Sequence, residues 1–339
     1  MSVIRLRRPP TIHSSGTVVG KKEHDGPYGA DFDLHDEENR FGMDTWEKSE
    51  SEMQRLALNL ALANGKMSPD ALQAIFAGDL INQCTGSAYG LRGFSTPYFG
   101  LYGACSTFAE GTMLASLMIS AEYFDCCAAV SSSHFCSAER QFRFPLEYGG
   151  QRAPTAQWTA TAAGAWVLTA DGNGPFVREV LPGTIVDKGI CDVNNMGAAM
   201  APAAIDTLEK YFSETGKKPT DFDLILTGDL GKEGHAIVME FMGAAGYDMK
   251  RVYQDCGLLL YSAGTQDTHG GGSGCGCSAS ILCGPILRRF RKGELHDILY
   301  LATGALMNAD SIKQGLTIPG IAHLVRISTE RTEHDGISS

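Results

Sequence analysis

The chain contains 339 residues, of which 43% are hydrophobic and 20% are charged. This length is typical of two domains or of one large double domain, and the apolar fraction is ample for a buried core. The net charge of −11 and the sequence pI near 5.3 argue against non-specific binding to nucleic acids or anionic membranes, because both require a basic surface.

The first half alternates between strand and helix signals. Residues 1–45 are charged, Gly-rich and irregular, and we expect them to form an extended surface arm. A helix is predicted over residues 46–64 from its apolar spacing, and an almost wholly apolar, buried helix is predicted after Cys105. The polar stretch 134–157 shows little periodicity. Strands are predicted at residues 72–80, 96–102, 126–133 and 163–170.

The second half repeats this alternation. A turn at residues 171–175 leads into a predicted strand, and Gly216 is suited to end a predicted helix over 201–216. Alternating strands and helices predict an α/β fold with mostly parallel sheets. The remaining predicted elements are strands at 175–187, 222–230, 278–283 and 298–306, and helices at 234–244 and 284–293.

Internal repeats suggest that the chain is a duplication. The tripeptide Gly-Asp-Leu occurs at residues 78–80 and again at 228–230. Two further landmarks, Cys105 with Cys277 and Asp125 with Asp297, share one offset of 172 residues. A shared offset indicates a duplicated α/β unit rather than chance similarity. A duplicated unit places its two equivalent loops face to face, so we expect a site at their junction.

We divide the chain into an N-terminal arm (1–45), a first half (46–172) and a second half (173–339). The ten cysteines include no CxxC spacing, and several lie in apolar runs, such as Cys126 and Cys127. We interpret these as small core residues and predict neither a disulfide scaffold nor a metal site. No signal peptide is recognised, and no apolar run reaches the ~18 residues of a spanning helix, so we expect a cytosolic protein.

Several motifs together resemble a known superfamily over nearly the whole chain. The order GACST, FDCCAAVSSS, AAGAWVLTA, ILTGDLG, GGGSGCGCSAS and DILYLATGAL is similar to that of thiolases and ketoacyl synthases. More narrowly, SSSHFCSAERQFRFPLEYGGQ, NNMGAAMAPAA and DCGLLLYS resemble the stage V sporulation protein AD family. The superfamily resemblance implies a thiolase-like fold of five layers, α-β-α-β-α, built from two duplicated βαβ-rich halves.

The narrower resemblance also implies a function. It implies binding of dipicolinic acid, free or as its calcium chelate, for uptake into the developing bacterial spore, and hence a link to calcium dipicolinate transport and germination. The implied location is peripheral, on the cytoplasmic side of the forespore inner membrane, and the implied partners are membrane proteins of the same spore operon. No cofactor is implied. The oligomeric state stays open between a monomer and the homodimer that the superfamily forms near residues 97–102.

Cys105 aligns with the nucleophile of the superfamily. A helix N-terminus beside the sulfur would lower the pKa of the thiol, but a small buried residue at a close backbone approach is the alternative interpretation. Condensing enzymes also need two histidines, or a histidine and an asparagine. Here the first position carries Asp229, and the Gly-rich second loop carries Gly and Cys. His235 lies inside a predicted helix, and His269 precedes the loop and is the remaining candidate.

The sequence therefore favours a binding protein that is not an enzyme. An acyl-transferring enzyme using Cys105 is the alternative, and a structural adaptor for a membrane channel is a third hypothesis.

Arg140 and Arg143 follow the end of the predicted strand 126–133 and could each donate two hydrogen bonds to a planar dianion. The competing interpretation pairs them with Glu139 and Glu147 on the surface. Calcium ligands, if needed, would be Asp79, Glu139 or Glu147. The predicted ligand-binding set is Asp79, Cys105, His134, Arg140, Arg143, Tyr148 and His269.

Overall fold

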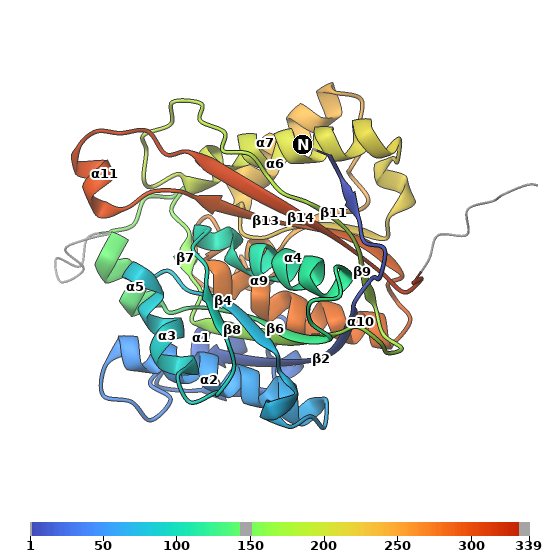
Figure 1. Cartoon of the computed structure of the whole chain (residues 1–339). Helices are drawn as coiled ribbons and strands as arrows, with labels where there is room; N and C mark the ends of the chain where they lie inside the picture. Colours follow the sequence, from blue (N-terminus) through green and yellow to red (C-terminus); the bar gives the residue numbers. More distant parts are fainter. Residues whose placement is uncertain (1, 143–150, 332–339) are drawn as a thin grey trace, which may run out of the picture.

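The computed structural model describes residues 2–142 and 151–331. Two sets of five strands form its central framework (Figure 1). The first-half set runs in the order β5-β4-β6-β8-β2, and the second-half set in the order β11-β10-β13-β14-β9. Reading each set along the chain gives the same topology twice, which confirms the duplication predicted from the repeated tripeptide.

Seven of these ten strands lie at predicted positions, whereas β2, β11 and β14 were not predicted as strands. The first set consists of β2 (Thr11–Gly20), β4 (Ala74–Gly78), β5 (Tyr98–Gly100), β6 (Cys126–Ser133) and β8 (Ala162–Thr169). The second consists of β9 (Phe176–Leu181), β10 (Leu224–Thr227), β11 (Tyr253–Asp255), β13 (Asp297–Ala305) and β14 (Gly320–Ser328). The short strands are β1 (Ile4–Arg5), β3 (Leu34–Asp36), β7 (Trp158–Thr159) and β12 (Gly272–Ser273).

Each set of strands is mixed, whereas the sequence predicted mostly parallel pairing. The ladder of β4 with β5 and β6 is parallel, but β8 runs antiparallel to both β6 and β2. The second set repeats this arrangement, with β14 antiparallel to β13 and to β9. The two sets meet edge to edge where β2 pairs with β9 through Thr11 and Phe176.

Helices form three layers around these strands (Figure 1). The outer layer of the first half contains α2 (Trp46–Asn64), which contacts β2 and β8, and that of the second half contains α6 (Met196–Thr215), which contacts β13 and β14. Between the two sets lies α4 (Thr107–Ser120), which contacts β4 and β6 on one side and β13 and β14 on the other. The five-layer prediction is confirmed.

The remaining helices have these bounds: α1 (Lys21–His24), α3 (Thr85–Leu91), α5 (Phe135–Phe142), α7 (Gly231–Ala244), α8 (Cys256–Leu259), α9 (Cys275–Ile281), α10 (Leu287–Arg291) and α11 (Ala309–Lys313). Helix α6 is capped at both ends. The side chain of Asn195 accepts a hydrogen bond from the Ala198 N–H at the start of α6, and Gly216 ends that helix with a φ of +70°, as predicted.

Three expectations about these elements are wrong. Thr11–Gly20 lies inside the sheet as a mostly buried strand, so this part of residues 1–45 is not a surface arm; it corresponds to β9 in the second half. Residues 278–283 are helical, because α9 continues through a π-helical turn over Leu282–Ile286 into α10. A short apolar run that is buried on all sides reads equally well as a strand or as a helix. The stretch 134–157, read as irregular, contains α5.

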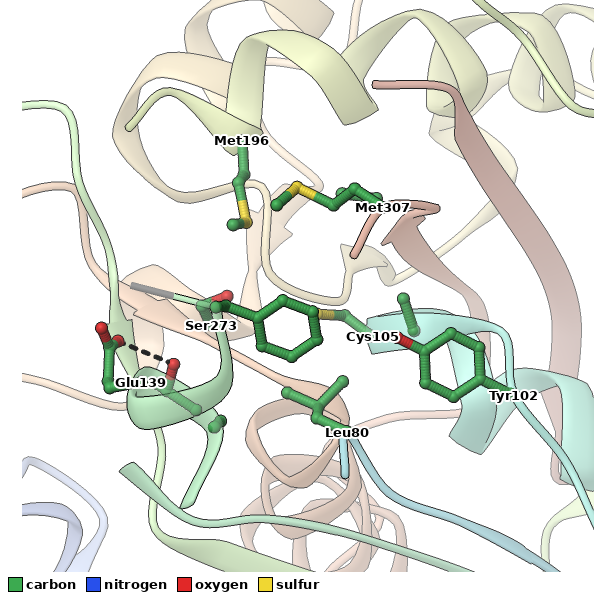
Figure 2. Close-up of a pocket in the computed structure, with 12 residues that line it drawn as sticks. Leu80, Tyr102, Cys105, Glu139, Met196, Ser273 and Met307 are labelled. Carbon is green, nitrogen blue, oxygen red and sulfur yellow. Dashed lines mark hydrogen bonds between the residues drawn. The ribbon is translucent and has the colours of Figure 1, made fainter. Parts of the chain in front are cut away.

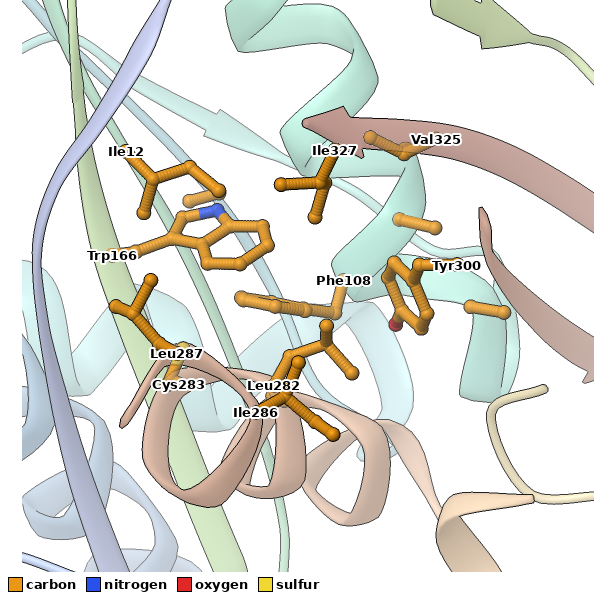
Figure 3. Packing of buried hydrophobic residues seen from close by; sticks show 14 of the residues in the cluster. Ile12, Phe108, Trp166, Leu282, Cys283, Ile286, Leu287, Tyr300, Val325 and Ile327 are labelled. Atoms are coloured by element: carbon orange, nitrogen blue, oxygen red, sulfur yellow. The ribbon is translucent and has the colours of Figure 1, made fainter. Parts of the chain in front are cut away.

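The core between the two sets of strands is centred on aromatic side chains (Figure 3). Phe108 of α4 packs against Trp166 of β8, with ring centroids 4.7 Å apart. The indole N–H of Trp166 donates to the Thr112 hydroxyl at 3.0 Å, so its one polar group is satisfied. Burying each such side chain stabilises the fold by roughly 1.5–3 kcal/mol.

Across the described residues, none of the helices has both the length and the apolar character needed to cross a bilayer.

Candidate functional site

A small cavity lies at the junction of the two halves, where the duplicated loops meet (Figure 2). Its volume is about 40 Å³, and its walls are mainly apolar. The first half contributes residues near the ends of β4, β5 and β6, and the second half contributes residues near α6, β12 and β13. The lining residues are Leu80, Tyr102, Ala104, Cys105, Ala138, Glu139, Phe142, Thr159, Met196, Ser273, Ala305 and Met307.

Cys105 lies on a tight elbow between β5 and α4. Ala104, directly before it, has a φ of +51°, a left-handed value that is uncommon for a residue with a side chain. The elbow is held by the Ser106 hydroxyl, which donates to the Gly103 carbonyl at 2.6 Å. The second half approaches closely here: a Cβ on Gly304 would lie 2.2 Å from the Gly103 oxygen, so β13 needs glycine at this position.

The thiol of Cys105 is kept neutral by its surroundings. Burial raises its pKa well above the usual value, and the Asp229 carboxylate, with which it hydrogen-bonds, and the Cys275 sulfur raise the pKa further. The helix N-terminus was expected to lower this pKa, but burial and the neighbouring negative charge outweigh that effect. A neutral, buried thiol is a poor nucleophile.

Asp229 occupies the position that the superfamily resemblance assigns to a catalytic histidine. Its carboxylate accepts hydrogen bonds from the Gly274 N–H at 2.8 Å and from the hydroxyls of Ser273 and Thr303, each at 3.2 Å. Burial raises its pKa to about 6 in spite of these donors. A carboxylate beside the sulfur opposes formation of the thiolate, as predicted from the sequence.

The two histidines considered as replacements lie elsewhere. His235 is on α7 and stacks on Tyr253, with ring centroids 4.5 Å apart, and burial lowers its pKa. Nε2 of His269 lies 2.9 Å from the Asp267 carboxylate, and its Nδ1 lies 2.9 Å from the Ala153 carbonyl oxygen. Neither residue lines the cavity, so His269 is not placed to contact a ligand bound beside Cys105.

His134 and Asp79 are fully buried, but neither lines the cavity. Nε2 of His134 lies 2.9 Å from the Asn39 carbonyl oxygen, and burial lowers the pKa of its ring to about 4, so the imidazole is neutral. The Asp79 carboxylate accepts hydrogen bonds from the Ile81 N–H at 2.8 Å and from the backbone and hydroxyl of Ser87. Both side chains therefore brace the framework and are not placed in the cavity.

Arg140 also points away from the cavity. Its guanidinium pairs with Glu47 of α2 at the surface, while the adjacent Glu139 turns inward and accepts a hydrogen bond from the Thr159 hydroxyl at 3.0 Å. Successive residues of a helix point about 100° apart, so only one of the two can face the cavity. Arg143, Glu147 and Tyr148 lie outside the described residues.

Of the predicted ligand-binding set, the described structure therefore places one member, Cys105, in the cavity wall. The main residues that sequence reasoning missed are Tyr102, Phe142, Met196 and Met307, all of which read as ordinary core side chains. The motifs did indicate where part of the wall would lie, because Leu80, Ser273 and Ala305 are in or next to them.

Within residues 2–142 and 151–331, no group of three or more His, Cys, Asp or Glu side chains is arranged to hold a metal ion.

Comparisons with known proteins agree on one family and one fold. The family model for stage V sporulation protein AD (SpoVAD) matches residues 1–328. The stage V sporulation protein AD of Bacillus subtilis (strain 168) is 39% identical over 318 residues, which cover 94% of each chain.

Similar solved structures have low sequence identity to this chain. The 3-oxoacyl-[acyl-carrier-protein] synthase III of Aquifex aeolicus has a TM-score of 0.57 at 15% identity, covering 94% of this chain and 99% of the other. The cerulenin-bound OleA of Xanthomonas campestris has a TM-score of 0.60 at 12% identity, covering 94% of this chain and 96% of the other. At such identities the similarity shows a shared thiolase-like fold and nothing finer.

Proposed function

The chain belongs to the stage V sporulation protein AD family, and from this premise we propose that it binds dipicolinic acid, free or as its calcium chelate, and releases it unchanged. Family membership supports a role in sporulation. The proposed role within that process is uptake of dipicolinate into the developing spore, with a link to germination. We place the protein at the cytoplasmic side of the forespore inner membrane, beside membrane proteins of the same spore operon.

The observation that carries the proposal is the surroundings of Cys105. The elbow and the cavity of a condensing enzyme are present, but Asp229 faces the thiol, and none of the described residues that line the cavity is a histidine or an asparagine. Carbon–carbon bond formation on a thioester needs a thiolate and donors that stabilise a carbanion. A neutral thiol beside a carboxylate supplies neither, which supports binding without reaction.

The cavity offers dipicolinate mainly apolar walls, which include Met196 and Met307. The hydroxyls of Thr159 and Ser273 already donate to Glu139 and Asp229, so a cation for the ligand carboxylates has to come from outside this lining. A space of about 40 Å³ holds only a few water molecules, so ligand entry requires these methionine side chains to move. Methionine suits this role because its unbranched chain adapts to several shapes. Arg143, the residue that follows Phe142 in the chain, remains the proposed cation for a carboxylate.

The direct test is a calorimetric titration of the purified protein with dipicolinate, in the presence and in the absence of calcium. We expect saturable binding at one site, and a weaker response to benzene-1,3-dicarboxylate, which has the same two carboxylates but no ring nitrogen. Arg143→Ala should weaken binding while the melting temperature stays near that of the wild type. No saturable binding under either condition would refute the proposal.

An acyl-transferring enzyme is the second candidate, because a cysteine is retained at the elbow and a similar solved structure is an acyl-condensing enzyme. Incubation with acyl-CoA followed by intact-mass measurement separates the two functions. The binding proposal expects no mass increase. An acyl adduct that Cys105→Ser abolishes, followed by turnover to a condensed product, would replace the binding proposal with an enzymatic one.

The proposed partners require their own experiment. The protein should co-purify with membranes of sporulating cells that carry the spore operon, and should be released when its membrane proteins are deleted. A purely structural adaptor would also co-purify, but variants of the cavity, such as Ser273→Phe, would then restore normal spore dipicolinate. Loss of dipicolinate with retained membrane association would support ligand handling by this cavity.

A further inference from the structure

A second hollow adjoins the cavity at Cys105. It has a volume of about 410 Å³, roughly ten times that of the inner cavity, and its lining includes Asn82, Gln83 and Asn308. Tyr102 and Met307 line both spaces. One of these residues comes from the first half and the other from the second, so the two spaces adjoin at the junction of the halves.

The two spaces differ in chemistry. The inner cavity is mainly apolar, whereas the outer hollow presents the three carboxamides of Asn82, Gln83 and Asn308. The oxygen of the Asn308 carboxamide accepts the Ser311 N–H at 2.8 Å as a helix cap, so its NH₂ group remains a donor. The NH₂ groups of carboxamides donate hydrogen bonds to carboxylate oxygens, and they carry no charge whose state could change with pH. Such donors suit a solvent-open site where a carboxylate ligand first binds.

The turn that carries Gln83 is strained and firmly held. Gln83 and Cys84 have φ values of +57° and +52°, in the left-handed region that residues with side chains avoid. The turn is fixed by the Cys84 thiol, which donates to the Leu101 carbonyl at 3.0 Å, and by Gln141 of α5, which accepts the Asn82 N–H at 3.1 Å. Strain that the surrounding structure maintains in this way concentrates at ligand sites and switches.

Two side chains lie at the boundary that the spaces share. The ring of Tyr102 lies beside Cys105 (Figure 2), and this residue is 43% exposed where it lines the hollow together with Met307. Both side chains rotate about single bonds, and Tyr102 lies outside the tightly bonded elbow that begins at Gly103. The elbow can therefore stay in place while these two side chains swing aside.

We propose that the outer hollow is the reception site for the small planar dicarboxylate, and that Tyr102 and Met307 form the gate through which it reaches the cavity at Cys105. The identity of the ligand rests on the proposed function, whereas the gate does not. The size of each space supports this order of events, because the outer hollow accepts such a molecule as it stands and the inner cavity does not.

The gate is tested without any ligand, by the rate at which alkylating reagents modify Cys105. Iodoacetamide and the bulkier N-ethylmaleimide are applied to the wild type, Tyr102→Ala and Tyr102→Phe, and modification is followed by peptide mass spectrometry with the exposed Cys191 as internal reference. We expect Tyr102→Ala to accelerate modification of Cys105 about tenfold, and more for the bulkier reagent, whereas Tyr102→Phe keeps the wild-type rate. An unchanged rate in a folded Tyr102→Ala variant overturns the gate.

The reception site is tested with dipicolinate and a matched pair of charge changes. Gln83→Glu places a carboxylate in the hollow, and Gln314→Glu makes the same change on the exposed end of α11 outside it. We expect Gln83→Glu to weaken the affinity about tenfold and Gln314→Glu to leave it nearly unchanged. Equal weakening by both overturns the reception site. Failure of the wild type to bind ends the proposed function and the reception site together, while alkylation still decides the gate.

Discussion

The tripeptide Gly-Asp-Leu follows β4 and β10 alike, yet its two aspartates have different partners. Among the described residues, the hydrogen-bond donors to Asp79 belong to its own half and include Ile81 and Ser87. Asp229 reaches across its half to the Gly-rich loop, where it accepts from Gly274, and it also contacts the thiol of Cys105 in the first half. The same motif therefore has two roles. In the first half its aspartate stabilises the framework, and in the second half its aspartate acts on the cysteine at the cavity.

Each aspartate also has a second buried carboxylate nearby. Glu50 of α2 lies close enough to Asp79 for their charges to interact, and Asp255 at the end of β11 does the same with Asp229. Glu50 is bound by the hydroxyls of Ser132 and Ser137, whereas Asp255 is bound by the Thr227 hydroxyl and by the backbone N–H groups of Leu230 and Gly231. The two halves therefore bury carboxylates in equivalent places, and the neighbouring residues determine whether such a carboxylate contacts Cys105.

The largest difference between the two loops is expected at the glycine before each aspartate. A Cβ on Gly78 would lie 2.1 Å from the Leu101 carbonyl oxygen, whereas on Gly228 the nearest atom is Ala302 Cα at 3.2 Å. We expect Gly78→Ala to lower the free energy of unfolding by about 3 kcal/mol, and Gly228→Ala by about 1 kcal/mol or less. Urea unfolding measures both. Equal losses would show that the two loops are packed alike, contrary to the comparison.

The next effect concerns pH and the first carboxylate pair. Burial and the nearby Asp79 raise the pKa of Glu50 from 4.5 to about 8. A raised folded-state pKa means that the folded protein binds the proton more tightly, so this stability is complete below about pH 4.5 and is lost as pH rises to about 8. Relative to the wild type, Glu50→Gln should therefore gain about 2 kcal/mol in unfolding free energy between about pH 5 and about pH 6.5, and the gain should increase further up to about pH 8.

Urea titrations at several pH values measure this difference, and Glu52→Gln, on the same helix but forming an ion pair with Arg55, is the control. The control should leave the pH dependence parallel to that of the wild type. Parallel curves for Glu50→Gln as well would mean that Glu50 is ionised in the folded protein at neutral pH.

Much of the fold could be predicted because its signals are local or repeated. The predicted helix at 46–64 is α2, and the predicted strand at 126–133 is β6. The offset shared by the two landmark pairs, of which Cys105 and Cys277 are one, indicated the duplication. The predictions failed where the local sequence pattern does not show how a segment packs against the rest of the chain. Thr11–Gly20 is polar enough to be interpreted as an arm, but it forms β2, which pairs with β8 at the edge of the first-half set. The second half has its equivalent strand, β9, in the same place.

The site was less predictable than the fold, because a cavity wall is made by tertiary packing. Arg140 and Glu139 are neighbours in sequence, and the start and direction of α5 decide which of them faces inward. His134 belongs to the predicted ligand-binding set but is enclosed beside Trp46, with ring centroids 5.3 Å apart. By contrast, Asp229 beside the thiol was predictable, since its motif and the elbow are both fixed by the superfamily pattern.

A smaller effect tests the second aspartate directly. Asp229→Asn removes the negative charge that hydrogen-bonds with the Cys105 thiol, so the thiol pKa should fall. A fall of about one unit would raise the rate of Cys105 alkylation about tenfold at a fixed pH below that pKa. Asp79→Asn is the matched change and should leave the rate nearly unchanged. Equal acceleration by both would mean that the first-half carboxylate also acts on the elbow.

The smallest effect is expected at the surface, where α5 meets α2. Arg140 and Glu47 form an ion pair whose side chains are 46% and 35% exposed. Water and salt screen such a pair, so Arg140→Ala should cost less than about 1 kcal/mol in unfolding free energy and should leave dipicolinate affinity unchanged. A double-mutant cycle with Glu47→Ala measures the coupling. A coupling well above that value, or a loss of affinity in Arg140→Ala alone, would mean that this pair holds α5 against the cavity and that the first half also tunes the site.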